Sequence, residues 1–192
     1  MIKTLYPTFQ KWSEKGSVYL YSDPHFDDPD MGEYFGYASP DDQIANINKV
    51  VTRSDYLIIL GDFGDPKYLP RIKTPHLIGV MGNHDQGTTK YAPYFEELYS
   101  GPLFISEKIL LSHEPIEYPY AMNIHGHAHK PHNGVANWYS FNDPTHLNVA
   151  ADVIGYTPVS LGKLIKDGLL SEVPSIHRET IDRAIQRKSV EK

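Results

Sequence analysis

Short apolar runs, each followed by residues that can bind cations, recur along this chain. They restrict its fold more than any other feature. The run Val18–Tyr21 is followed by Asp23 and His25, and the run Tyr56–Leu60 is followed by Asp62. Each run has the length of a buried strand and is too short for a core helix. The chain therefore places a carboxylate or an imidazole directly after each of these predicted strands.

Three later runs end in the same way. Residues 76–81 precede Asn83, His84 and Asp85, residues 108–111 precede His113, and residues 122–125 precede His127 and His129. Ligands of α/β proteins bind beyond the carboxyl ends of the strands, so we expect these side chains to converge. The tetrapeptide Gly-Asn-His-Asp at residues 82–85 is the most specific of the five motifs.

The segments between the runs indicate a layered α/β protein with mixed sheets and helices on its faces. Ser39 before Pro40 is typical of a helix N-terminus, and apolar residues then follow at helical spacing to about Arg53. Residues 24–39 are expected to form a long loop, residues 137–141 and 146–150 strands, and residues 159–169 a helix. A second helix, highly charged, is expected from about residue 176.

Composition excludes several classes of protein. A length of 192 residues suits one domain, which we expect to span residues 1–192. The 18 basic and 24 acidic residues give a net charge of −6, which argues against general nucleic-acid binding and against a basic membrane-surface protein. The apolar runs are too short for a membrane span, and the N-terminal stretch is too polar for a secretory signal, so we expect a cytoplasmic location. Nothing in the sequence indicates an oligomeric state.

Buried carboxylates and imidazoles that converge require cations to neutralise and coordinate them. Seven residues are candidate ligands: Asp23, His25, Asp62, Asn83, His113, His127 and His129. Seven ligands are too many for one ion with room for a substrate, whereas Asp62 could bridge two ions about 3.5–4 Å apart. Mixed His and Asp ligands suit Mn²⁺, which we favour, or Fe, Zn or Ni, and the absence of Cys excludes thiolate ligands.

The five motifs, from Asp23 to His129, resemble the signature of the calcineurin-like metallophosphoesterase superfamily. The stretch from residue 148 to residue 161 resembles the endings of its small, uncharacterised bacterial and phage members. The resemblance implies two mixed β-sheets packed as a sandwich and flanked by helices. It also implies that Asp23, His25 and His129 hold one metal ion, that Asn83, His113 and His127 hold the other, and that Asp62 is shared. His84 would protonate the leaving group, and Asp85 would orient His84.

The activity that this resemblance implies is hydrolysis of phosphodiester bonds by a metal-bridging hydroxide, with a small phosphate ester or a nucleotide as substrate. One alternative is a phosphomonoesterase that acts on a nucleotide or another small phosphate. A non-catalytic scaffold on the same fold is less expected, because such scaffolds lose ligands or the acid histidine and this chain has all of them.

Two departures from the superfamily pattern restrict the substrate. Asp27 and Asp28 stand where small relatives often carry Gly-His, which puts one substrate contact in doubt. No Arg follows Asp62 closely, so a bidentate phosphate clamp is not visible and a phosphoprotein substrate is not expected. Seven further residues could contact a substrate, but a surface position or a packing role explains them equally well. They are Lys130, His132, Tyr34, Tyr37, Tyr91, Tyr94 and Tyr118. Packing is the favoured role for the tyrosines.

Overall fold

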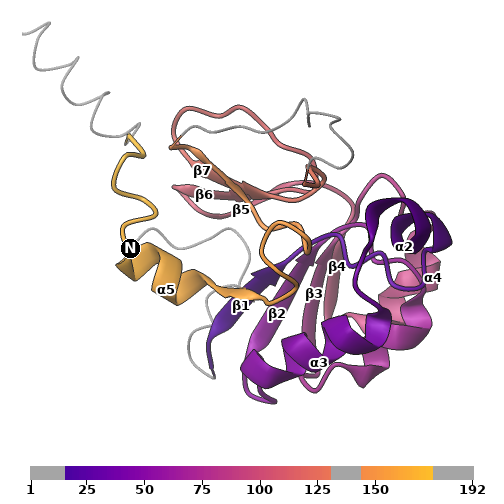
Figure 1. The fold of residues 1–192 in the computed structure, drawn as a ribbon. Helices are drawn as coiled ribbons and strands as arrows, with labels where there is room; N and C mark the ends of the chain where they lie inside the picture. Colours follow the sequence, from indigo (N-terminus) through magenta and orange to yellow (C-terminus); the bar gives the residue numbers. More distant parts are fainter. Residues whose placement is uncertain (1–15, 131–143, 175–192) are drawn as a thin grey trace, which may run out of the picture.

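The computed structural model describes residues 16–130 and 144–174, which form two β-sheets with helices (Figure 1). The elements are β1 Val18–Tyr21, α2 Pro29–Phe35, α3 Pro40–Val50, β2 Tyr56–Leu60, η2 Pro66–Arg71, β3 His76–Val80, α4 Thr88–Tyr91, η3 Ala92–Tyr94, β4 Glu97–Tyr99, β5 Leu103–Ser106, β6 Ile109–Leu111, β7 Met122–His125, β8 His146–Asn148, β9 Val159–Ser160 and α5 Leu161–Lys166. No described helix is both long enough and apolar enough to cross a membrane.

Both sheets are mixed, as predicted. The first has the order β4-β3-β2-β1-β9, in which β1 to β4 are parallel and β9 is antiparallel to β1. The second has the order β5-β6-β7-β8, in which β5 is antiparallel to β6 and the other neighbours are parallel. The predicted α/β class with two mixed sheets and helices is therefore confirmed.

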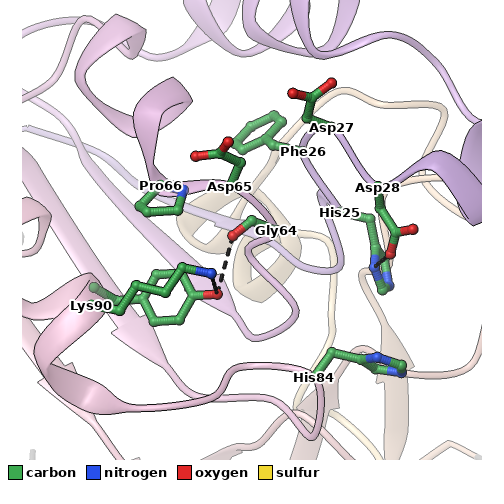
Figure 2. Close-up of a pocket in the computed structure, with 10 residues that line it drawn as sticks. His25, Phe26, Asp27, Asp28, Gly64, Asp65, Pro66, His84 and Lys90 are labelled. Carbon is green, nitrogen blue, oxygen red and sulfur yellow. Dashed lines mark hydrogen bonds and ion pairs between the residues drawn. The ribbon is translucent and has the colours of Figure 1, made fainter.

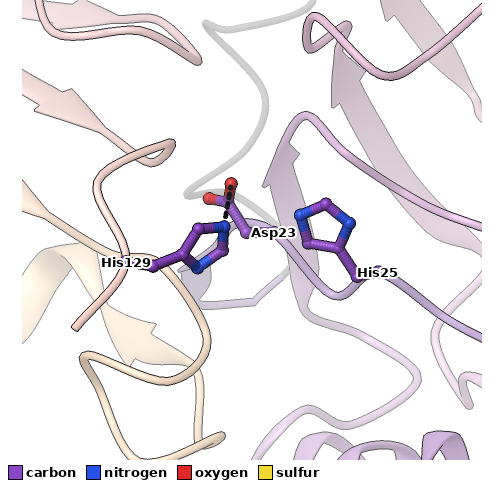
Figure 3. Close-up of side chains that lie close together, drawn as sticks. All are labelled: Asp23, His25 and His129. Carbon is purple, nitrogen blue, oxygen red and sulfur yellow. Dashed lines mark ion pairs between the residues drawn. The ribbon is translucent and has the colours of Figure 1, made fainter. Parts of the chain in front are cut away.

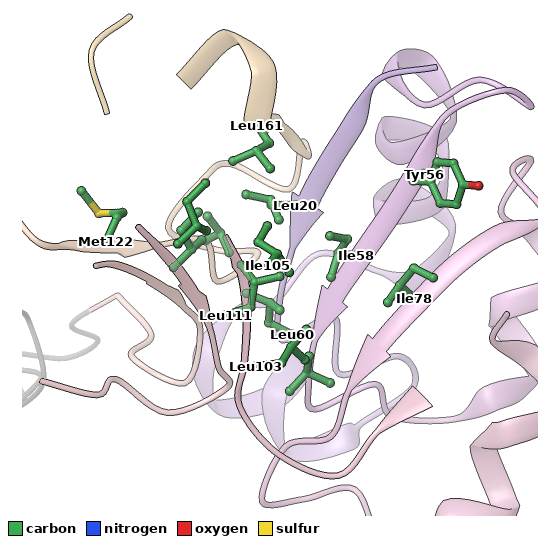
Figure 4. Packing of buried hydrophobic residues seen from close by; sticks show 14 of the residues in the cluster. Leu20, Tyr56, Ile58, Leu60, Ile78, Leu103, Ile105, Leu111, Met122 and Leu161 are labelled. Carbon is green, nitrogen blue, oxygen red and sulfur yellow. The ribbon is translucent and has the colours of Figure 1, made fainter. Parts of the chain in front are cut away.

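The two sheets pack against each other, and the main hydrophobic core lies between them (Figure 4). Leu20, Ile58 and Ile78 of the first sheet belong to the same buried cluster as Leu111 and Ile124 of the second. The alternate residues of β1 and β2 face the other way and form a second cluster with helix α3. Strand β2 is therefore buried on both faces, which explains why its sequence is apolar without alternation.

Helix α3 begins where the sequence predicts and ends sooner. The Ser39 side chain accepts the backbone N–H of Asp42, and Pro40 occupies the first turn. The helix ends at Val50, not near Arg53, because the chain turns extended at Val51 and Asp55 then accepts the backbone N–H of Thr52 at 2.7 Å. This bond offers the backbone an alternative to another helical turn.

Two other segments differ from the predictions. The interval 24–39 contains helix α2, which Asp28 caps at its start and Gly36 ends in a left-handed conformation, so the prediction of a continuous loop is wrong there. Residues 159–160 pair with β1 as strand β9, and helix α5 begins only after them. The strand expected at 137–141 and the helix expected from about 176 lie outside the described residues.

Candidate metal centre

The loops that follow β1, β2 and β3 leave the first sheet at one edge because these strands are parallel. Backbone hydrogen bonds then join the first two loops, from Asp23 N to Gly61 O at 3.1 Å and from His25 N to Asp62 O at 2.9 Å. Just beyond the end of β1, Ser22 pairs with Ala150, which follows β8 of the second sheet. The carboxyl ends of strands from both sheets therefore meet at one place.

Six of the seven predicted ligands form two triads there, and each triad could bind a metal ion. The first triad is Asp23, His25 and His129, which Figure 3 shows from close by. The second is Asp62, His113 and His127. Within each triad the candidate ligand atoms lie within 4.8 Å of one another, and the Asp side chains are almost fully buried.

Asp62 lies between the two triads. Its Oδ2 atom is 3.4 Å from Nε2 of His113 in its own triad and 3.5 Å from Nε2 of His25 in the other. The seventh predicted ligand, Asn83, is exposed, and its Oδ1 atom lies 2.8 Å from Nε2 of His113 and 3.1 Å from Nδ1 of His127. Atoms bound to one ion at about 2.0–2.2 Å lie roughly 3–3.5 Å apart, so these separations suit shared coordination.

The orientation of the imidazoles fits metal binding. In three of them the Nδ1 atom meets an acceptor outside the triads: His25 meets the Asp28 carboxylate at 3.2 Å, His113 the Leu60 carbonyl at 2.8 Å, and His129 the Asp152 carboxylate at 3.3 Å. Each Nε2 atom is left to face the centre, as in metal-binding histidines. Nε2 of His25 is the one buried side-chain nitrogen or oxygen of the described residues that has no hydrogen-bond partner.

The buried charges of the centre shift one another's pKa values. Burial raises the pKa of Asp23 to about 6, against the attraction of His113 and His129, and burial lowers the pKa of His25 to about 4. At Asp62 the effect of burial is outweighed by hydrogen bonding and charge from His113, so its pKa falls to about 2. The pKa of His113 rises to about 9 because the same carboxylate and Asp23 outweigh burial. A bound cation would stabilise the ionised carboxylates and relieve the cost of burying Asp23.

Four candidate ligands have left-handed backbone conformations, which non-glycine residues rarely adopt. Their φ angles are 54° at Asp23, 43° at His25, 52° at Asp62 and 63° at His127. Each such residue costs on the order of 1–3 kcal/mol, and strain of this kind gathers at functional sites. The fold therefore tolerates strain at the residues that turn these side chains toward the centre.

Two glycines permit the close approach of the loops. A Cβ at Gly126 would lie 1.9 Å from Ser22 Oγ and 2.1 Å from Asp23 Oδ2, and a Cβ at Gly82 would lie 2.3 Å from Asp62 Oδ1. Both distances from the candidate ligands are far below van der Waals contact. The glycines in the Gly-Asn and Gly-His motifs thus leave room for the ligands.

The predicted acid, His84, lies at the edge of the centre. Its backbone N–H donates to Asp62 Oδ1 at 3.0 Å, and its exposed ring lies 5.6 Å from the ring of His25. Both rings line a cavity of about 450 Å³ (Figure 2). The side chain of His84 is thus available to a molecule in that cavity.

The Asp85 carboxylate contacts the backbone and makes no hydrogen bond with the His84 ring in the described structure. Its Oδ2 atom accepts the N–H groups of Asp62 and Gly82, each at 2.8 Å, and its Oδ1 atom accepts that of Phe63 at 2.9 Å. Burial raises its pKa, and the bonds from Gly82 and Phe63 oppose that shift. Asp85 therefore joins the loop after β2 to the loop after β3.

Other residues that the sequence singled out have varied positions. Tyr91 is buried and donates to Gly64 O, and Tyr37 donates to Asp23 O at 2.8 Å beneath the first triad, so both tyrosines are packed. Tyr34 and Tyr94 are exposed, Tyr118 is half-buried, Lys130 has an exposed side chain, and His132 lies outside the described residues. The hydrogen bond of Tyr37 and the partners of the histidines, Asp28 and Asp152, were not predicted, because no motif or spacing marks them.

Comparisons with known proteins support the fold. The two matches that cover 78% of this chain are proteins whose activity is not named. No protein-family model matches the chain. An uncharacterized protein of Methanocaldococcus jannaschii is 29% identical over 170 residues, which are 78% of this chain and 89% of that protein. A protein of unknown function from Aquifex aeolicus has a similar structure, with a TM-score of 0.62 and 27% identity over 78% of this chain and 98% of its own. The nuclease MPE of Pseudomonas putida matches 58% of this chain and 61% of its own, with a TM-score of 0.45 and 21% identity.

Proposed function

We propose that this protein is a metal-dependent phosphoesterase that uses two divalent ions and prefers small phosphodiesters. The observation that carries the proposal is the position of Asp62, whose Oδ2 atom lies 3.4 and 3.5 Å from an imidazole nitrogen of each triad. A carboxylate placed between two sets of imidazoles suits a pair of ions bridged by one ligand. The resemblance of the five motifs to calcineurin-like metallophosphoesterases points the same way.

In this proposal Asp23, His25 and His129 would hold one ion, Asn83, His113 and His127 would hold the other, and Asp62 would contribute to both. Divalent ions at such a site lower the pKa of water toward neutrality and offset the charge of a phosphate ester, and we favour Mn²⁺ for both positions. The neutral amide of Asn83 adds a ligand without adding negative charge next to the substrate.

His84 is the proposed proton donor to the leaving oxygen. It is anchored through its backbone N–H, which bonds to Asp62, while its ring faces the 450 Å³ cavity. A proton donor must be close to the substrate, and the proposed role is supported by the place of His84 in the wall of the cavity in which we propose that the substrate binds. The backbone anchor also means that removing the ring leaves the bond to Asp62 in place.

Hydrolysis assays test the proposal directly. Protein stripped with a chelator would be assayed on bis-p-nitrophenyl phosphate and on p-nitrophenyl phosphate, with and without Mn²⁺. We expect metal-dependent turnover of both, with the diester preferred. Preference for the monoester would favour a phosphomonoesterase, and no turnover of either ester with two ions bound would contradict the proposal.

Two substitutions separate the roles of the residues. His84→Ala should lower turnover about 10²–10⁴-fold without loss of bound metal, as expected for a general acid. Asp62→Ala should lower both turnover and the number of bound ions, measured by elemental analysis. His76→Ala is the matched control, because this half-buried histidine pairs with Glu96 at the opposite end of β3 and should affect neither.

A further inference from the structure

The candidate centre has a cavity on each of two sides. The 450 Å³ cavity includes His25 and His84 in its wall, and a second cavity of about 220 Å³ includes Asn83 and His113. The two cavities have no lining residue in common. Asn83 and His84 are consecutive, yet each lines a different cavity, so both cavities border the loop that follows β3.

Asp62 lies close to a lining residue of each cavity, although it lines neither. Its Oδ2 atom is 3.5 Å from His25, which lines the larger cavity, and 3.4 Å from His113, which lines the smaller one. A phosphorus centre next to Asp62 would therefore have space on two sides. A phosphodiester carries two substituents and needs both spaces, whereas a monoester carries one.

The position of His84 indicates which substituent of the ester would occupy each cavity. The leaving substituent must lie beside the proton donor, and His84 lines the larger cavity. The smaller cavity is then left for the substituent that stays on phosphorus. At about 220 Å³ it is smaller than the roughly 300–1,000 Å³ of typical ligand pockets, so it suits a compact group.

The lining of the smaller cavity disfavours a negatively charged substituent. Its residues include the apolar Val80, Met81 and Ile116 and the acidic Glu114, and no Lys or Arg is among those described there. An anionic group in this cavity would be repelled by Glu114, with no Lys or Arg beside it among the described lining residues.

We propose that the 220 Å³ cavity is the subsite for the retained substituent of the phosphodiester, and that it selects a small, uncharged group. This inference rests on the proposed function and adds a substrate class to it. The substrates would be diesters with one larger leaving substituent and one compact neutral substituent, such as a short alkyl group or a small alcohol.

A series of esters with one leaving group tests the size preference. The Mn²⁺-loaded protein would be assayed on p-nitrophenyl phosphate, on methyl p-nitrophenyl phosphate and on thymidine 5′-(p-nitrophenyl phosphate). We expect kcat/KM for the methyl diester to exceed that for the other two esters by about tenfold or more, as pocket contacts of this size allow. Equal values for the methyl and thymidine diesters would overturn the proposal.

Gly101 allows the cavity to be filled. It lies in the link between β4 and β5, it lines the smaller cavity, and a Cβ built there meets no atom within 4 Å. Gly101→Leu should lower the ratio of methyl diester to monoester turnover at least about tenfold. Gly162→Leu in helix α5 is the matched control, because a Cβ there is also unobstructed and the residue lines neither cavity. An unchanged ratio in Gly101→Leu would overturn the proposal.

Glu114→Gln tests the charge preference. Diesters with a propyl or a 2-carboxyethyl retained group match in size, and wild-type protein should favour the propyl ester. The substitution should reduce that preference several-fold, because it removes the repulsion from the carboxylate. A preference that Glu114→Gln leaves unchanged would contradict the assigned role of the cavity.

A binding measurement separates failure of this proposal from failure of the proposed function. If metal-loaded protein hydrolyses none of the esters, the proposed function fails, and the cavity is still tested by titration with dimethyl phosphate and with inorganic phosphate. Gly101→Leu should weaken binding of dimethyl phosphate about tenfold relative to inorganic phosphate. Equal effects on the two ligands would overturn the subsite.

Discussion

Replacement of Asp85 by Asn distinguishes a structural role in the metal centre from a role in proton transfer. The carboxylate is 8% exposed and accepts three backbone N–H groups at 2.8–2.9 Å. Asparagine keeps the shape but has one acceptor oxygen. If that oxygen stays with Asp62 and Gly82, the amide nitrogen faces the N–H group of Phe63, and that buried donor loses its partner.

The expected loss of stability follows from these three bonds. A hydrogen bond to a charged group contributes about 1.5–3 kcal/mol, compared with about 0.5–1.5 kcal/mol for a neutral one. One bond lost and two weakened, less the relief of a buried charge, give a decrease of roughly 2–4 kcal/mol in the free energy of unfolding. For a chain of this size that corresponds to a fall in Tm of about 5–15 °C.

The substitution should also weaken metal binding, because the three amides belong to the loops that carry Asp62 and Asn83. Urea unfolding of chelator-treated protein, metal titration and turnover at saturating metal measure the three effects. Asp30→Asn is the control, since this exposed carboxylate lies on helix α2 away from the three amides. If Asp85→Asn lost turnover with unchanged stability and metal affinity, Asp85 would act on His84 and the structural role would be refuted.

Three further outcomes follow from the same geometry. Gly126→Ala should lower both Tm and metal affinity, because its Cβ would overlap Asp23, and an unchanged Tm would refute this account. Asp152→Asn should weaken metal binding about 10–100-fold, because it loosens the orientation of His129, and unaltered titration curves would argue against that role. The pKa of His113 is raised from 6.5 to about 9, so its pairing stabilises the metal-free protein fully below pH 6.5 and this contribution is lost as the pH rises through about 9. An ion must displace that proton, so metal affinity measured by calorimetry should increase with pH over the same range, and a pH-independent affinity would contradict it.

The sequence predicts most strongly those elements that are buried on both faces. Strand β2 is apolar at every position because one face packs on the second sheet and the other on helix α3, and this pattern was sufficient to locate it. Helix α2 was missed because Met31 is its one buried residue, so no apolar periodicity accompanies its Asp28 cap and Gly36 end. Strand β4 has three residues, all half-buried, and such a segment gives no reliable pattern.

The convergence of the candidate ligands could be predicted because it depends on residue type and strand direction. Polar residues after parallel strands gather at one edge whatever the details of packing. The partners of the histidines could not be predicted in this way. Asp152 contacts His129 although the two residues are 23 positions apart in the sequence, and the backbone contacts of Asp85 depend on how two loops pack. Neither contact follows from local spacing.

The charge balance of the centre explains how it could bind a phosphate ester without an arginine clamp. In the metal-free protein the negative charge of Asp62 is met by protonated His113, whose raised pKa reflects that pairing. Two divalent ions would replace the displaced protons. Their charge exceeds that of the carboxylates of Asp23 and Asp62, so the centre would have a net positive charge. No Arg is among the described residues that line either cavity, and Lys90 is the one Lys, so most of the attraction for a phosphate would come from the ions. If the proposal holds, the side chains of the centre supply ligands for the ions, and the two cavities would determine which substituents of the ester are accepted.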